Sequence, residues 1–190
     1  MRESDLNHEG GTALVVIDMQ RIFAEPDSQW YVSTYTAAER VIAGLCKQHE
    51  GKVIWTKFMR DPSERGSWAG YYQRWDRCRL DEQSEQWELT AQPAKHDEII
   101  TLPTFSKWGP ELAGLTADCD HLVLTGVATD CCVLSTALGA VDAGKRVTVV
   151  ADACGGATPE AHEQSLAVLG LLAPMITITT SDHLAGLTAP

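Results

Sequence analysis

The chain has 190 residues, of which 44% are hydrophobic and 22% are charged. These values predict one globular domain, residues 1–190, and exclude a chain that is disordered throughout. The formal net charge is −11 and no long basic cluster is present, which argues against nucleic acid or an anionic membrane as a partner.

No apolar run reaches the roughly 18 residues that a transmembrane helix needs. The segment from Met1 to Gly10 is polar and charged and does not resemble a secretory signal, so we expect a cytoplasmic protein. No two of the six cysteines have CxxC spacing. We therefore expect reduced thiols rather than a disulfide framework or a zinc knuckle.

Apolar strands alternate with amphipathic helices along the chain. Residues 13–17 are a continuous, largely β-branched run that ends at Asp18, which predicts a strand buried on both faces. The other predicted strands are Val53 to about Met59, Glu98–Leu102, His121–Thr125, Arg146–Ala151 and Met175–Thr179. The predicted helices are Tyr35–His49, Pro110–Ala117, Cys131–Ala143 and Pro159–Leu172.

This alternation predicts right-handed crossovers and a mainly parallel, six-stranded sheet. The expected fold class is therefore α/β, a three-layer, doubly wound (Rossmann-like) arrangement with helices on both faces. In such sheets ligands bind beyond the carboxyl ends of the strands. The residues that follow each strand are thus the candidates for a functional site.

Residues 60–97, here called the insertion, interrupt the alternation. They are polar but contain Trp68, Trp75, Trp87 and the pair Tyr71-Tyr72. A connection of this length inside a compact domain is usually functional or partly helical. Two interpretations are open: a segment that packs its aromatic side chains on the domain or on a neighbouring subunit, or a lid that lines a substrate pocket.

Three reactive side chains follow predicted strands. Asp18 closes the first strand, Lys107 lies in the loop after the third, and Cys132 lies in the first turn after the fourth. A carboxylate, an amine and a thiol that meet at one edge of the sheet would provide a base, a cation and a nucleophile. Taken singly, each has a more ordinary interpretation: a turn aspartate, a solvated lysine and a buried helix cysteine.

Position favours Cys132 as the nucleophile. Thr129 or Asp130 is a suitable N-cap for the helix that begins there. The positive end of the helix dipole would lower the pKa of a thiol in its first turn. Free backbone N–H groups of the same turn would be able to hold an oxyanion.

Three motifs lie at the ends of predicted strands: Ala13-Leu-Val-Val-Ile-Asp-Met-Gln20, Gly126-Val-Ala-Thr-Asp-Cys-Cys-Val133 and Val149-Val-Ala-Asp-Ala153. In this order they resemble the opening strand, the nucleophile turn and a later strand end of the isochorismatase-like cysteine hydrolase superfamily. The resemblance runs from about residue 12 to about residue 180 and is weakest between residues 60 and 100.

The resemblance implies a Cys-Asp-Lys triad, in which the aspartate accepts the thiol proton and later activates water. By position, Cys132 matches the nucleophile and Asp18 the base, while Cys131 is a bystander. The family often has a cis peptide in the nucleophile turn, which here would join Val127 and Ala128. The Ala128 and Cys132 N–H groups would then point into an oxyanion hole.

The lysine departs from the family pattern. The family usually places it at the end of the third strand, which is near Leu102 here, a few residues before a segment like Phe105-Ser-Lys-Trp108. Lys107 is the nearest lysine downstream, and Phe-x-Lys-Trp-Gly looks like a variant found in a subgroup of the family. We predict that Lys107 reaches the site from the loop; the alternative is a site without its cation.

No metal and no cofactor are expected. Family members that hydrolyse nicotinamide carry an Asp-x-His metal site shortly after the second strand. The corresponding segment here, Thr56-Lys-Phe-Met-Arg-Asp-Pro62, contains no histidine. The six histidines of the chain, at positions 8, 49, 96, 121, 162 and 183, show no ligand spacing, so a nicotinamidase is disfavoured.

These features predict a metal-independent hydrolase that cleaves a small amide or ureido C–N substrate through a thioester on Cys132. Phe23, Trp108 and Trp68 are predicted to line its pocket. The expected partners are the small-molecule substrate and further copies of the chain, in a homodimer or homotetramer as is common in the family. Two alternatives stay open: an isochorismate-type vinyl-ether hydrolase, which needs no thiol, and a catalytically idle ligand-binding or oligomeric scaffold.

Overall fold

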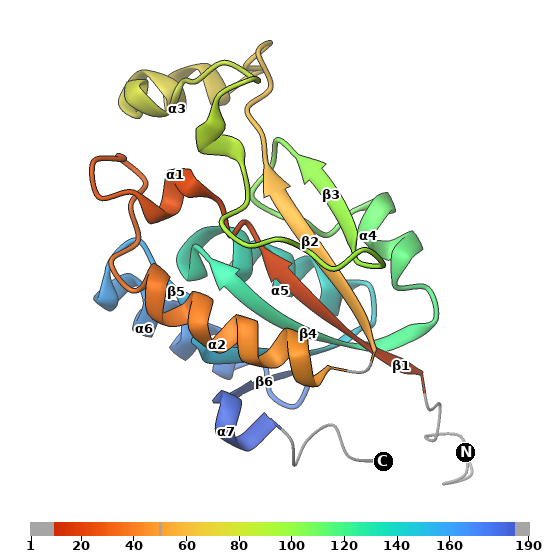
Figure 1. The fold of residues 1–190 in the computed structure, drawn as a ribbon. Coiled ribbons are helices and arrows are strands. Elements are labelled where there is room, and N and C mark those ends of the chain that lie inside the picture. Colours follow the sequence, from red (N-terminus) through yellow and green to blue (C-terminus); the bar gives the residue numbers. More distant parts are fainter. Residues whose placement is uncertain (1–9, 50, 185–190) are drawn as a thin grey trace, which may run out of the picture.

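A computed structural model describes residues 10–49 and 51–184; the polar segment at residues 1–9 lies outside them. Six parallel strands form one sheet in the order β3-β2-β1-β4-β5-β6 (Figure 1). The strands are β1 (Gly11–Ile17), β2 (Lys52–Phe58), β3 (Glu98–Leu102), β4 (Cys119–Val127), β5 (Arg146–Gly155) and β6 (Ile176–Thr179). The predicted fold class, a doubly wound α/β sandwich, is confirmed.

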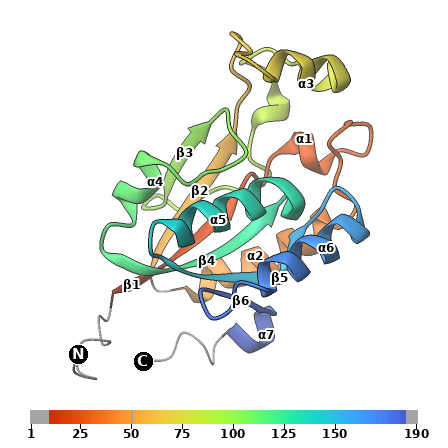
Figure 2. The same ribbon diagram turned by 180° about the vertical axis from the view of Figure 1, so that it is seen from behind.

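Helices cover both faces of the sheet (Figures 1 and 2). One face carries α2 (Tyr35–Gln48) and α7 (Ser181–Leu184). The other face carries α4 (Pro110–Leu115), α5 (Leu134–Asp142) and α6 (Pro159–Gly170). The remaining short elements are α1 (Arg21–Ala24), α3 (Trp68–Arg74), η2 (Asp76–Cys78), η3 (Glu85–Trp87) and η4 (Thr129–Val133). No helix in the described part of the chain combines the length and the apolar character needed to span a membrane.

Strand β1 lies at the centre of the sheet and contributes to two cores. Leu14 and Val16 pack in the core beneath α2. Ala13, Val15 and Ile17 face the opposite way, toward α4, α5 and α6. All five are at most 1% exposed, which is the double-sided burial that an unbroken apolar run predicts.

The insertion packs on the domain through its aromatic side chains. Trp87 is fully buried and Tyr72 nearly so, and both belong to the core beneath α2. Glu64 accepts hydrogen bonds from Arg60 Nε at 2.6 Å and from Arg79 Nε at 2.7 Å. This carboxylate ties the beginning of the insertion to its middle and fixes α3 above the carboxyl ends of the strands (Figure 1).

Gly126 marks the close approach of β4 to β1. Its φ is +107°, and a Cβ at this position would collide with the backbone of Ile17. Glycine is the residue that tolerates both conditions.

We expect Gly126→Ala to lower the free energy of unfolding by about 3 kcal/mol or more, because strained backbone and a backbone collision combine. Gly144→Ala is the matched control, since φ is +87° there but the added Cβ would meet nothing within 4 Å. Its expected loss is about 1–2 kcal/mol, from backbone strain alone. Urea denaturation measures both variants, and equal losses would contradict the role assigned to the β1 contact.

Candidate active site

The three predicted catalytic side chains come together at the carboxyl edge of the sheet. Asp18 follows β1, Lys107 reaches in from the loop after β3, and Cys132 lies just beyond β4. Asp18 and Lys107 are 0% exposed and Cys132 is 3% exposed. The interpretation of Lys107 as a solvated surface charge is therefore wrong.

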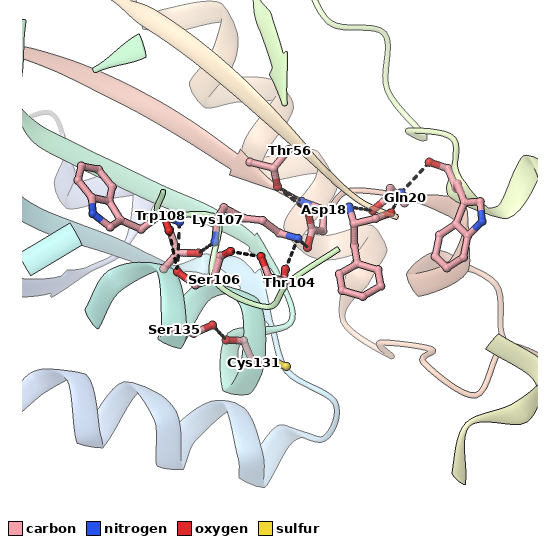
Figure 3. A network of polar contacts seen from close by, with 12 residues as sticks. Asp18, Gln20, Thr56, Thr104, Ser106, Lys107, Trp108, Cys131 and Ser135 are labelled. Atoms are coloured by element: carbon pink, nitrogen blue, oxygen red, sulfur yellow. Dashed lines mark hydrogen bonds and ion pairs between the residues drawn. The ribbon is translucent and has the colours of Figure 1, made fainter. Parts of the chain in front are cut away.

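Asp18 and Lys107 form a buried ion pair. Lys107 Nζ lies 3.0 Å from Asp18 Oδ2, and the same amino group donates to the Thr104 carbonyl oxygen at 2.8 Å. The other carboxylate oxygen, Asp18 Oδ1, accepts a hydrogen bond from Thr56 Oγ1 at 2.5 Å. Figure 3 shows the lysine side chain and Thr56 converging on the carboxylate, so each oxygen of Asp18 has its own partner.

Further contacts fix the lysine. The Lys107 backbone N–H donates to Thr136 Oγ1 of α5 at 2.8 Å, which anchors the loop after β3. Its amino group also lies 4.8 Å from the centre of the Phe58 ring, within the range of a cation–π contact. Leu102, near the position where the family usually has its lysine, is apolar. The loop after β3 supplies the positive charge instead, from Lys107, five residues further along the chain.

The nucleophile turn has an unusual backbone. The Val127–Ala128 peptide bond is cis, and Cys132 then lies in η4, a π-helical turn, before α5 begins. The single helix predicted from Cys131 to Ala143 is therefore two elements. Short π-helical turns occur frequently at functional sites.

The predicted N-cap is wrong. Neither Thr129 nor Asp130 caps the helix, because both side chains are used to hold neighbouring elements. Thr129 Oγ1 lies 2.8 Å from His162 Nδ1 of α6. Asp130 Oδ1 accepts a hydrogen bond from the Ala157 backbone N–H at 2.8 Å. These contacts join the nucleophile turn to the segment that follows β5.

The expectation of a lowered thiol pKa is also wrong. The neighbouring Cys131 side chain, burial and the negative charge of Asp18 hold the pKa of Cys132 well above its ordinary value, and Lys107 opposes them. A thiolate in this position would be desolvated next to a carboxylate, which disfavours the charged form. The resting side chain is therefore a neutral thiol that needs a base at the moment of attack.

A cavity of about 480 Å³ opens on Cys132. Its volume lies in the range of small-molecule sites. The aromatic residues of its wall are Phe23, Trp30, Tyr31, Phe58, Tyr71, Trp75 and Phe105. The wall therefore suits an apolar, flat ligand group next to the thiol.

The three residues predicted to line the pocket lie in different places. Phe23 lines the cavity, but Trp108 and Trp68 do not. Trp108 lies over Gly139 of α5, and Trp68 packs behind Phe105, with ring centroids 4.9 Å apart.

The insertion instead contributes Tyr71 and Trp75 to the cavity wall. The spacing of its aromatic residues, at positions 68, 71, 72 and 75, is that of one helix face. This signal was present in the sequence and predicts α3.

Gln20 joins the insertion to the sheet, a role that the sequence analysis missed. Its Nε2 donates to the Phe58 carbonyl oxygen at 2.9 Å and to the Trp87 carbonyl oxygen at 2.7 Å. Its Oε1 accepts from the Phe58 backbone N–H at 2.7 Å. The glutamine of the Asp-Met-Gln motif thus holds the end of β2 and the insertion beside Asp18 (Figure 3).

Two buried or partly buried histidines are engaged by hydroxyl groups: His162 beside the nucleophile turn, and His121 at the amino end of β4, away from the site. Besides the contact of His162 with Thr129, His121 Nε2 lies 2.8 Å from Thr148 Oγ1. Within residues 10–49 and 51–184, no three His, Cys, Asp or Glu side chains are grouped so that they would hold a metal ion.

Over residues 12–182 the sequence matches the family model of the isochorismatase domain. The chain belongs to the isochorismatase family. This membership indicates a hydrolase. No curated protein sequence is significantly similar to it.

Solved structures of isochorismatase-like proteins share the fold. An isochorismatase family protein from Desulfovibrio vulgaris has a TM-score of 0.81 at 23% identity, over 95% of this chain and 100% of that one. A cysteine hydrolase from Pseudomonas syringae pv. phaseolicola has a TM-score of 0.80 at 22% identity, over 91% and 90%. A nicotinamidase from Bacillus subtilis has a TM-score of 0.72 at 20% identity, over 88% and 98%.

We expect Lys107→Met to lower the free energy of unfolding by about 3–5 kcal/mol, because it leaves the Asp18 carboxylate buried without its cation. The double variant Asp18→Asn/Lys107→Met removes both charges and should recover most of this loss. A double-mutant cycle by urea denaturation measures the coupling. Additive losses would show that the two charges do not stabilise each other.

Asp18→Asn should make Cys132 easier to ionise, because it removes a negative charge that raises the thiol pKa and leaves Lys107, which lowers it. We expect the pH of half-maximal alkylation by iodoacetamide to fall, as followed by peptide mass mapping. Cys154 is the internal control, since burial raises its pKa to about 12. An unchanged or higher pH for Cys132 would refute this electrostatic account.

Proposed function

We propose that the chain hydrolyses a C–N bond of a small amide or ureido compound through a thioester on Cys132. The observation that carries the proposal is the buried Asp18–Lys107 pair beside a thiol on the wall of a ligand-sized cavity. The proposal includes no metal, because the segment after β2 lacks the histidine of the metal-dependent family members. Reduced thiols suit the cytoplasm, where we propose that the protein works.

The first half of the reaction forms the thioester. Asp18 accepts the proton of Cys132 Sγ while the sulfur attacks the carbonyl carbon, whose oxygen becomes an oxyanion. The backbone N–H groups of Ala128 and Cys132 donate hydrogen bonds to this oxyanion. The C–N bond then breaks, and the leaving nitrogen takes the proton from Asp18.

The second half releases the acid. Asp18 removes a proton from water as the water oxygen attacks the thioester carbon. The tetrahedral intermediate collapses, the C–S bond breaks, and the sulfur recovers the proton from Asp18. Lys107 acts in both halves by offsetting the negative charge that moves between the carboxylate and the sulfur.

The raised pKa of Cys132 fits this sequence of steps. A neutral thiol has to lose its proton during attack, and Asp18 is the group placed to receive it. Asp18→Asn should therefore abolish turnover even though it makes the thiol easier to alkylate. These opposite effects separate a general-base role from a role in simply stabilising a thiolate.

The test compares Cys132→Ala, Asp18→Asn and Cys131→Ala in a screen of primary amides and N-carbamoyl compounds, with ammonia release as the readout. We expect the first two variants to lose about 10³-fold or more in kcat, since they remove the nucleophile and the base. Cys131→Ala, the control at the adjacent thiol, should stay within severalfold of the wild type. Ammonia release that survives Cys132→Ala but not Asp18→Asn would overturn the thioester on Cys132.

A further inference from the structure

The cavity wall next to Cys132 is built around one indole. Trp30 lies nearly parallel to Phe23, with ring centroids 5.9 Å apart and an interplanar angle of 13°. It meets Phe58 edge-on, at 5.6 Å and 90°, and Tyr71 at 5.9 Å. Rings that are already packed against one another lose little freedom on binding, so this wall is prepared to receive a further flat ring.

Two charged side chains also line the cavity, Arg74 and Asp130. Asp130 Oδ1 accepts a hydrogen bond from the Ala157 backbone N–H, and the carboxylate keeps its negative charge, so an anionic group has to bind at the Arg74 side, away from Asp130. Arg74, at the carboxyl end of α3, is exposed and lies over the Trp75 ring at 5.1 Å. Among the described residues it forms no ion pair with a carboxylate.

The charge distribution favours an anion at the Arg74 side of the cavity. Next to Cys132, the negative charge of Asp18 is paired with the positive charge of Lys107. These two residues together therefore contribute no net charge to the site. The chain as a whole has a net charge of −11, and an anionic ligand is repelled unless a local cation attracts it. Arg74 is the one cation on the described wall of this cavity, and a guanidinium binds carboxylates in a two-pronged geometry.

We propose that the substrate is an aromatic amide that also carries an anionic group, such as a carboxylate. The ring lies among Phe23, Trp30 and Phe58, the scissile carbonyl faces Cys132, and the anionic group pairs with Arg74. This inference rests on the proposed C–N hydrolysis for its reacting bond. Arg74 is then a specificity residue, because it contacts the substrate away from the bond that breaks.

The first arm of the test measures turnover. The probes are benzamide, 3- and 4-carbamoylbenzoate, 3-carbamoyl-N,N,N-trimethylanilinium and the aliphatic anion succinamate. We expect one of the carbamoylbenzoates to exceed benzamide, the cationic amide and succinamate by about tenfold or more in kcat/KM. Arg74→Gln should raise KM for the carbamoylbenzoates by about tenfold and so remove their advantage over benzamide. Arg77→Gln, the same charge change three residues away and outside the cavity wall, should keep the preference.

The second arm measures binding without catalysis. In Cys132→Ala, the carbamoylbenzoates should bind with a Kd at least about tenfold below that of benzamide by titration calorimetry, and the added Arg74→Gln change should abolish the difference. Binding of this kind without turnover in the wild type would support the ligand class and refute C–N hydrolysis. Turnover of benzamide and carbamoylbenzoates that is equal and unaffected by Arg74→Gln would refute the ligand class and leave the hydrolysis standing. Absence of both turnover and Arg74-dependent binding would overturn the inference.

Discussion

The rest of the site depends on the buried ion pair between Asp18 and Lys107. Two charges removed from water are stable only if their partners are close and their other hydrogen-bonding positions are filled. Here Thr56 of β2 holds one carboxylate oxygen, while the Thr104 carbonyl and the Phe58 ring flank the amino group. Thr136 of α5 fixes the backbone of the lysine. The pair can therefore form only when four segments are in place: the end of β1, β2, the loop after β3 and α5. A change that displaces any of them would weaken the pair.

The same pair affects the ionisation of Cys132, the nucleophile that we propose. Lys107 lowers the pKa of the Cys132 thiol, whereas Asp18 raises it. Cys131 and burial also raise this pKa, so it stays well above its ordinary value. The thiol is thus kept protonated next to the group that would remove its proton. In the mechanism that we propose, the thiol loses its proton only when a substrate carbonyl is present to accept the sulfur.

The sequence predicts the sheet well because its strands are buried on both faces. The run at residues 13–17 and the later apolar runs have no other stable location than a parallel sheet, and Asp18 and Cys132 follow directly from the ends of those strands. Their catalytic roles stay predictions. The meeting of Lys107 and Asp18 was suggested by their places after two strands and strengthened by the resemblance, but the loop after β3 has no periodicity that shows where its side chains point.

The details of the pocket were less predictable, for physical reasons. Thr129 and Asp130 are good N-cap residues by local preference, but tertiary contacts with His162 and Ala157 use their side chains instead. Trp68 begins α3 and Trp75 directly follows it, and periodicity alone does not say which of them faces the cavity. That choice depends on how α3 is docked on the domain, which Glu64, Gln20 and the buried Trp87 determine together.

The measurement that tests the central claim most directly is capture of the covalent intermediate. Wild-type protein is mixed with an amide that it turns over, quenched with acid within the first turnover, and digested for peptide mass mapping. The account predicts that the acyl group of the substrate is attached to Cys132 and to no other cysteine, with its formation preceding release of the acid. Product formed in the first turnover without any acyl group on Cys132, or an acyl group carried by Cys131, would contradict it.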